Sequence, residues 1–334
     1  MRHTVDTLHH QYSAVYPKPL SFDPAKPLEE QKAAIREKYI QLLKMPEKTL
    51  HGEMTVEWEK GDDPRFDEIR FSVETEPGFF VPCHMLLPKG LAKGEKRPAI
   101  ICLQGHSTGM HISLGRPKFP GDEKSISGGD RDFAIQAVAR GYIAIAMEQR
   151  GFGELKSEVT ERGCHHLMAQ CLMNGRTLQG ERIHDVMCLV DALEGYEHAD
   201  MDRIAIMGNS GGGTTAYHAA CIEERIKVVM PSCSFNTYEH SILSMLHCLC
   251  NYVPDISVYM EMPDLAMLIA PRPLLIVNGL TDAIFPIDTA RSSFEIVKKI
   301  YEAAGAAENC RHIVGGEGHR FYAADAWPVF EKFI

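Results

Sequence analysis

The sequence contains no run of about 18 consecutive apolar residues, the minimum for a helix that crosses a bilayer. Its first residues, MRHTVDTLHHQYSAVYP, also lack the apolar core of a secretory signal. Basic residues are too few for a phosphate-backbone partner, because 35 Lys and Arg face 45 Asp and Glu and the formal net charge is −10. We therefore expect neither a membrane-spanning segment nor a nucleic-acid partner.

The ten cysteines lack the layout of a small disulfide-stapled scaffold, because they are scattered through apolar stretches, as at Cys102 and Cys221. Buried, reduced thiols are the simplest prediction, and they favour a cytoplasmic protein. One cluster stands apart, His247-Cys248-Leu249-Cys250. Its C-x-C spacing differs from the C-x2-C of common zinc sites, and no second matching pair follows, so we expect no metal.

Short apolar runs alternate with helical segments after residue 88. This alternation predicts an α/β fold with a mostly parallel central sheet and helices on both faces. Two earlier runs, 66–74 and 78–88, are separated by a turn signal and predict an antiparallel hairpin at one edge. The expected strands of the parallel part are 97–104, 142–149, 203–207, 226–232, 271–279 and 311–314. The expected helices are about 132–140, 177–193, 212 onward and 289–304.

The chain divides into two regions by its patterns. Residues 1–60 predict an N-terminal arm, extended over 1–27, followed by an amphipathic helix over 28–45. Residues 61–334 predict the α/β domain. A Met-rich, aromatic and helical stretch at about 233–270 interrupts the alternation, and we expect it to form a cap, because ligands bind beyond the carboxyl ends of the strands in open α/β sheets.

A glycine cluster follows the apolar run 203–207, in the stretch RIAIMGNSGGGTTAYHAAC. A phosphate-binding P-loop would need a lysine after the glycines, and none is present. Gly211, Gly213 and Ala216 formally match a dinucleotide-binding pattern, but the acidic residue expected about 20 positions on is missing. Neither phosphate interpretation is favoured.

The same cluster reads G-x-S-x-G around Ser210. In a strand-to-helix elbow the serine takes a strained backbone conformation that exposes its hydroxyl above the sheet. Gly208 and Gly212 provide the clearance that such a turn needs. The context, an apolar strand before and a helix after, predicts that Ser210 is a nucleophile.

A serine hydroxyl needs a general base and an acid that orients the base. In this architecture the order is serine, acid, histidine. Asp282 follows the expected strand 271–279, and His319 follows the strand 311–314 in a loop rich in glycine. The sequence therefore predicts a Ser210–Asp282–His319 triad, with Asp288 interpreted as a helix cap and Glu317 as a solvated charge.

The donors for the developing oxyanion should be backbone N–H groups. We expect that of Gly211, at the start of the helix behind the serine, and that of His106, in the turn after the strand 97–104. Arg150 follows another strand end, and an internal ion pair that braces the loops is the favoured role for it.

Over residues 60–334 the chain resembles the α/β-hydrolase superfamily, in particular the acetyl xylan esterases and cephalosporin C deacetylases. Besides the elbow, the resemblance depends on QRGFGE (149–154), GRTLQGERIHDVMCLVDAL (175–193) and APRPLLIVNGLTD (270–282). It implies a serine carboxylic ester hydrolase that cleaves small acyl groups, acetyl among them, through an acyl-enzyme. It implies no metal and no organic cofactor.

Partners and alternatives follow from the same resemblance. The expected partner is a small-molecule ester, with acylated carbohydrates among the candidates, and the N-terminal arm and the cap could support a homo-oligomer. A serine peptidase of the prolyl-oligopeptidase type shares the elbow and the triad order but normally carries a large additional domain. A non-catalytic binding protein that retains the fold is the other alternative.

Overall fold

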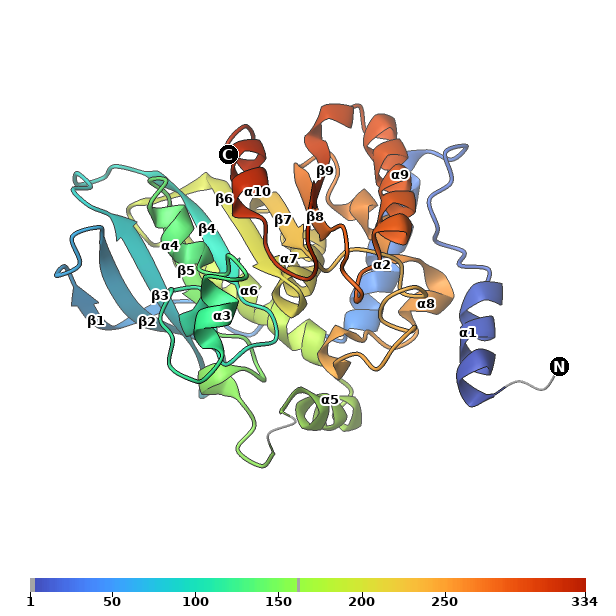
Figure 1. Ribbon diagram of the computed structural model, residues 1–334, viewed down its shortest axis with the longest axis horizontal. Helices are drawn as coiled ribbons and strands as arrows, with labels where there is room; N and C mark the ends of the chain where they lie inside the picture. The colour runs from blue at the N-terminus through green and yellow to red at the C-terminus, as the bar shows by residue number, and fades with distance from the viewer. Residues whose placement is uncertain (1–3, 161–162) are drawn as a thin grey trace.

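The structure is a computed structural model that describes residues 4–160 and 163–334. Within these residues one sheet of nine strands runs through the molecule in the order β1-β2-β3-β5-β4-β6-β7-β8-β9 (Figure 1). The strands are β1 (Met54–Lys60), β2 (Phe66–Glu76), β3 (Phe79–Pro88), β4 (Arg97–Leu103), β5 (Ile143–Met147), β6 (Ala199–Asn209), β7 (Ile226–Ser232), β8 (Leu274–Gly279) and β9 (Cys310–Gly315).

Six adjacent strands pair in parallel: β5, β4, β6, β7, β8 and β9. The strands β1, β2 and β3 form an antiparallel meander at one edge, and β3 joins β5 antiparallel. The interior strands are mostly apolar, because helices cover both of their faces. The predicted α/β fold, with a mostly parallel sheet and an antiparallel edge hairpin, is confirmed.

Two hydrophobic cores lie on opposite faces of the sheet. Ile101 and Leu103 of β4 belong to one core, whereas Ile100 and Cys102 belong to the other, as the two-residue period of a strand requires. The first core is covered by α2 (Leu28–Leu43), α6 (Leu178–Glu194), α7 (Gly211–Ile222) and α9 (Ile287–Ala303). The second is covered by α4 (Phe133–Val138) and α10 (Ala323–Phe330).

The N-terminal region differs in part from the prediction. Residues expected to be extended form a helix, α1 (Val5–Val15), which Thr4 starts with a capping box to Thr7. The amphipathic helix is confirmed as α2, and its buried side chains, Tyr39 among them, join the same core as α6 and α7. In Figure 1, α1 stands away from the body of the protein. The division of the chain at residue 60 and the homo-oligomer stay predictions.

The inserted stretch lies between β7 and β8, as expected, but it contains only short helices. These are η3 (Leu249–Asn251), α8 (Ile256–Tyr259) and η4 (Met262–Leu268). Pro254 disfavours helix at the residue before it, and Asp255 has a left-handed backbone, so no long helix can pass through this stretch.

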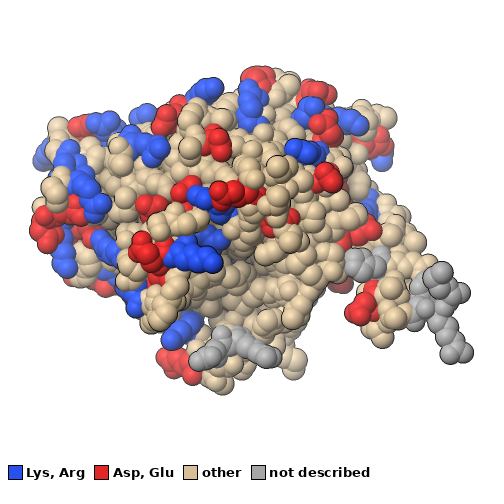
Figure 2. All heavy atoms as spheres, in the orientation of Figure 1, with Lys and Arg blue, Asp and Glu red and all other residues tan. Residues whose placement is uncertain are grey.

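Other short helices were not predicted. Of these, α5 (Gly163–Met173) lies against η3 and covers a small third core. The remaining ones are η1 (Met110–Ile112), α3 (Asp122–Ile126), η2 (Gly153–Leu155) and η5 (Ala307–Asn309). No helix within the described ranges is long and apolar enough to span a bilayer. On the face shown in Figure 2, basic and acidic side chains are interspersed.

Arg150 forms the internal ion pair that the sequence predicted. It is buried, and its Nε and Nη2 donate to Asp185 of α6 at 2.8 and 2.7 Å. Its Nη1 donates to Glu76 of β2 at 2.8 Å and lies 3.1 Å from Glu181. The guanidinium therefore fastens the loop after β5 to β2 and α6.

We expect Arg150→Met to destabilise the protein by about 3–5 kcal/mol, because it leaves the buried Asp185 carboxylate without its cation. The matched control is Arg65→Met, which removes an exposed pair with Asp63 and should leave stability nearly unchanged. Urea unfolding followed by tryptophan fluorescence measures both. Equal losses in the two variants would contradict a bracing role for Arg150.

Candidate active site

Ser210 lies at the sharp turn between β6 and α7. Its backbone has φ 56° and ψ −125°, a positive φ that side-chain-bearing residues rarely adopt. The Ser210 N–H donates to the carbonyl of Ser232 in β7 at 2.8 Å, which fixes the turn to the neighbouring strand. The strand-to-helix elbow is thus present, and it leaves the serine half-buried at the carboxyl end of the sheet.

The glycines around Ser210 provide steric clearance. A Cβ atom at Gly208 would lie 2.5 Å from the backbone carbon of Gly212 and 2.7 Å from the carbonyl oxygen of Leu103. A Cβ atom at Gly212 would collide with the carbonyl oxygens of Leu103 and Gln104. Any larger residue would push α7 away from β4, so glycine at both positions sets how closely the helix approaches the sheet.

Asp282 and His319 lie side by side beyond the ends of β8 and β9. The Nδ1 atom of His319 is 2.7 Å from Oδ2 of Asp282. Asp282 is buried, and its Oδ1 accepts the N–H of Ile284 at 2.8 Å. The ring of Phe285 stacks on the imidazole with centroids 6.0 Å apart and planes 15° apart. The carboxylate and the aromatic ring together fix the orientation of the imidazole.

The pKa of Asp282 is lowered from its usual value. Burial is the largest influence and raises the pKa, but the hydrogen bond and the charge of His319 outweigh it, helped by the N–H groups of Ile284 and Phe285. The group therefore stays a carboxylate and can stabilise positive charge on the imidazole.

One cavity of about 320 Å³ brings the serine and the histidine together. Ser210, His319 and His106 all line it. The other lining residues are Arg131, Met245, Leu246, His247, Cys248 and Ile284. Among the described residues no hydrogen bond joins the Ser210 hydroxyl to the imidazole, and such bonds are often long until a substrate binds. Of the two rival acids, Asp288 is not the helix cap that the sequence predicted, because α9 begins after Pro286 without a side-chain cap hydrogen bond and the Asp288 side chain is exposed. Glu317 is a solvated charge, as expected.

The predicted oxyanion turn packs directly on the elbow. A Cβ atom at Gly105 would lie 2.6 Å from the carbonyl oxygen of Asn209 and 3.0 Å from the Cβ of Ser210. Gly211 begins α7, so its N–H has no acceptor within the helix. A Cβ at Gly211 would lie 2.9 Å from the His106 ring, which places His106 against the residue after the serine.

A buried support behind this turn was missed by the sequence analysis. The Gln104 side chain donates to Glu148 at 2.8 Å, and Gln149 donates to the Gln104 carbonyl at 2.7 Å. Burial raises the pKa of Glu148 to about 7, although its carboxyl group accepts backbone N–H groups of Glu154 and Met110. The signal that could have revealed it is the polar pair Glu148-Gln149 directly after an apolar strand.

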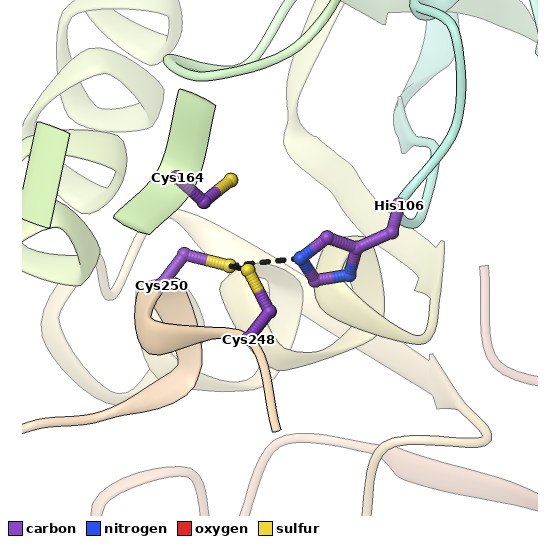
Figure 3. Close-up of side chains that lie close together, drawn as sticks. All are labelled: His106, Cys164, Cys248 and Cys250. Atoms are coloured by element: carbon purple, nitrogen blue, oxygen red, sulfur yellow. Dashed lines mark hydrogen bonds between the residues drawn. The ribbon is translucent and has the colours of Figure 1, made fainter. Parts of the chain in front are cut away.

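Two groups of side chains in the described ranges have the spacing of metal ligands. In the first, Cys233 lies with Asp282 and His319, but the Cys233 thiol donates to the carbonyl of Arg320 at 3.2 Å. Burial raises the pKa of that thiol to about 12, so it stays protonated and is a poor ligand. The second group consists of His106, Cys164, Cys248 and Cys250 (Figure 3).

The sheet order, the strained serine elbow and the carboxylate-bound imidazole define an α/β-hydrolase. A model of the family described as acetyl xylan esterase (AXE1) matches residues 118–286, just over half of the 334 residues. The chain belongs to this acetyl xylan esterase (AXE1) family. It is a carboxylic ester hydrolase, as the sequence predicted.

Relatives of known sequence or structure agree with this family. The provisionally named hydrolase YtaP of Bacillus subtilis strain 168 is 26% identical over 255 residues, 74% of this chain and 78% of that protein. A protein of Bacteroides fragilis NCTC 9343, provisionally named an acetyl xylan esterase, has a TM-score of 0.77 at 17% identity, over 93% of this chain and 82% of its own. Acetyl Xylan Esterase 1 from Thermoanaerobacterium sp. JW/SL YS485 has a TM-score of 0.60 at 16% identity, over 100% of this chain and 98% of its own. These structural likenesses show the fold.

We expect the Asp282→Asn variant to be less stable than the wild type at neutral pH, and we expect this difference to disappear in acid. A carboxyl group whose pKa is lowered by folding contributes stability above its unfolded pKa, about 3.9, and loses it as the pH falls through the folded pKa. The difference in unfolding free energy between wild type and variant should therefore be constant above about pH 5 and shrink below about pH 4. Urea titrations across pH measure this difference.

The control for this experiment is Asp288→Asn on the same segment. Its side chain is 95% exposed, so its stability curve should follow that of the wild type at every pH. A deficit in Asp282→Asn that grows as the pH falls would show that the Asp282 carboxylate is not stabilised by its neighbours.

Proposed function

We propose that the protein is a serine esterase in which Ser210 is the nucleophile, His319 the general base and Asp282 the residue that orients the base. One observation carries the proposal: a serine with a strained backbone opens into the same cavity as an imidazole whose Nδ1 lies 2.7 Å from a buried carboxylate. This is the arrangement that acyl transfer by a serine hydroxyl requires.

The reaction follows from the positions of these groups. Asp282 accepts the Nδ1–H of His319, so Nε2 carries the lone pair that removes the proton from the Ser210 hydroxyl as it attacks the acyl carbonyl. The imidazolium then protonates the leaving alcohol, and an acyl-Ser210 remains. Water, deprotonated by the same imidazole, releases the acid and restores the serine. The proton moves only between Nε2, the serine, the alcohol and water.

The oxyanion of each tetrahedral intermediate would be held by the backbone N–H groups of Gly211 and His106. Gly211 contributes a free N–H at the positive end of α7. The turn at Gly105 touches both Asn209 and Ser210, which brings the His106 backbone close to the nucleophile. Donors fixed by packing in this way need no rearrangement when charge develops on the carbonyl oxygen.

The proposed substrate is a small acyl ester, an acetyl ester among the candidates, of an alcohol such as a carbohydrate. The cavity above Ser210 is small, about 320 Å³, and the inserted stretch supplies its apolar members Met245 and Leu246. Such a wall suits a short acyl chain. The family description and the names of the related structures, which include an acetyl xylan esterase and a glucuronoyl esterase from Solibacter usitatus, support an acylated carbohydrate.

We also propose a reducing compartment, the cytoplasm, as the place of action. The ten cysteines are all free, and most are buried in apolar surroundings. Thiols of this kind stay reduced in the cytosol, whereas secreted proteins usually pair them.

We expect Ser210→Ala to reduce hydrolysis of p-nitrophenyl acetate on the order of 10⁴- to 10⁶-fold, since no other group supplies the nucleophile. Labelling by a fluorophosphonate should disappear in the same variant. The matched control is Ser234→Ala, a buried serine near the elbow whose hydroxyl has no partner in the described structure. It should keep both activity and labelling.

The alternative activities give different results in these assays. Faster cleavage of an aminoacyl-proline amide than of the acetyl ester would indicate a peptidase. Absence of labelling in a folded wild type would indicate a binding protein. Full activity in Ser210→Ala would contradict the nucleophile assignment outright.

We expect Gly211→Ala to lower kcat about 10- to 100-fold with KM little changed, because its methyl group would displace the His106 ring and with it the oxyanion turn. Gly316→Ala is the control, since a Cβ at that position meets nothing within 4 Å. Steady-state kinetics on the acetyl ester separate kcat from KM. A change in KM alone would place the defect in ground-state binding rather than in the oxyanion site.

A further inference from the structure

Four potential metal ligands from three distant segments converge beside the active site (Figure 3). His106 comes from the turn after β4, Cys164 from the first turn of α5, and two thiols from the inserted stretch. We call this set the thiol–imidazole cluster: His106 Nε2 and the Sγ atoms of Cys164, Cys248 and Cys250. All four atoms lie within 4.8 Å of one another.

The separations within the thiol–imidazole cluster are close to those of a tetrahedral site. The Sγ of Cys250 lies 3.1 Å from His106 Nε2 and 3.3 Å from the Sγ of Cys248. Zinc–sulfur bonds of about 2.3 Å at tetrahedral angles place two sulfur ligands about 3.8 Å apart. Small side-chain movements would therefore bring all four atoms onto one ion.

A buried positive charge lies next to the cluster and has no acidic partner among residues 4–160 and 163–334. The Arg182 side chain is fully buried, and its Nη2 lies 3.5 Å from Cys164 Sγ. Its Nε and Nη2 donate to the carbonyl of Arg150, and its Nη1 has no hydrogen-bond partner. No carboxylate pairs with Arg182 in the part of the chain that the structure describes. A buried guanidinium of this kind requires a nearby negative charge.

Metal binding would supply that charge. With three neutral thiols, Arg182 has no compensating negative charge among the residues that the structure describes. Three thiolates and one imidazole around a divalent ion carry a net charge of −1. The sulfurs of Cys250 and Cys248 also lie within electrostatic range of the guanidinium. Phe152 completes the surroundings, with its ring against His106 on one side and Arg182 on the other.

We infer that the thiol–imidazole cluster binds one Zn²⁺ ion in a structural site. Thiolate and imidazole ligands suit zinc, and four protein ligands leave no open position for water, so the ion would not take part in ester cleavage. On binding, each of the three thiols loses its proton to solvent and the neutral imidazole gives its Nε2 lone pair. No electron is transferred.

The ion would join three parts of the protein that the backbone leaves separate. It would link α5 and the inserted stretch, through Cys164 and Cys250, to the turn that carries the His106 N–H. Because Cys248 lines the cavity of Ser210, the site would also fix one wall of that cavity. The sequence analysis grouped His247 with these two cysteines and expected no metal there; in the structure the Nδ1 of His247 bonds the side chain of Asn251.

The test uses the full chain, purified under reducing conditions. Elemental analysis should find about one zinc ion per chain. Replacing zinc with Co²⁺ should produce the sulfur-to-cobalt charge-transfer band and the intense visible bands of a tetrahedral thiolate site. Cys164→Ser and Cys250→Ser should each weaken metal binding at least about tenfold.

Cys171→Ser is the matched control, because Cys171 is buried in the same helix as Cys164 but lies outside the cluster. It should keep the metal. Ser210→Ala should also bind zinc like the wild type, so the result is independent of the proposed nucleophile. Circular dichroism confirms that each variant is folded, and the cobalt spectrum of the wild type decides the question if the serine variants do not fold.

Three results would overturn the inference. One is a folded wild type without zinc that gives no thiolate band with Co²⁺. Another is retention of the metal by both serine variants. The third is a disulfide formed by Cys250. It would lower the mass of the unreduced wild type by two hydrogens, and this difference would be absent in Cys250→Ser.

Discussion

The contact between the elbow and the end of β4 is the constraint on which the rest of the site depends. Gly208 and Gly212 let α7 begin almost against the Leu103 carbonyl, and Gly105 lets the next turn touch Ser210. This packing holds the serine backbone at a positive φ, a conformation that costs on the order of 1–3 kcal/mol and persists only where the surroundings enforce it. The close approach thus fixes the direction of the Ser210 side chain before any substrate arrives.

The parallel sheet explains why residues far apart in the chain meet at this point. The carboxyl ends of β4, β6, β8 and β9 lie at one edge, and each is followed by a site residue or turn. The insertion after β7 emerges at the same edge, so its residues 245–248 line the cavity. The insertion therefore helps to set the size of the cavity, whereas the residues that follow the strands carry the reactive groups. Members of one fold can act on different substrates when the insertion changes and the residues at the strand ends are kept.

Features with a local cause could be predicted from the sequence. The apolar strands, the elbow at Ser210 and the order of Asp282 and His319 each depend on residues adjacent in the chain or on one fixed architecture. The helix α1 was missed although its capping signal, Thr4 with Thr7, is local, because a Pro- and His-rich segment was interpreted as extended. The insertion was expected to be more helical than it is, because the left-handed backbone at Asp255 is not visible in its composition.

Features that depend on long-range packing could not be predicted. The approach of Cys164 to Cys250 requires α5 to dock on the insertion, and neither its existence nor its place was evident from the sequence. The support of the turn after β4 by Glu148 depends likewise on the adjacency of β4 and β5. The sequence likewise grouped His247 with Cys248 and Cys250, whereas in the structure the imidazole next to Cys250 is that of His106, from a distant turn.

The most direct measurement of the central claim is the location of the covalent intermediate. Rapid mixing of the wild type with p-nitrophenyl acetate, acid quenching within the first turnover and peptide mapping by mass spectrometry would identify the acylated residue. The account predicts a burst of about one p-nitrophenolate per chain, with the acetyl group on Ser210. An acetyl group on any other side chain, or turnover with no covalent intermediate under conditions where acylation is fast, would contradict it.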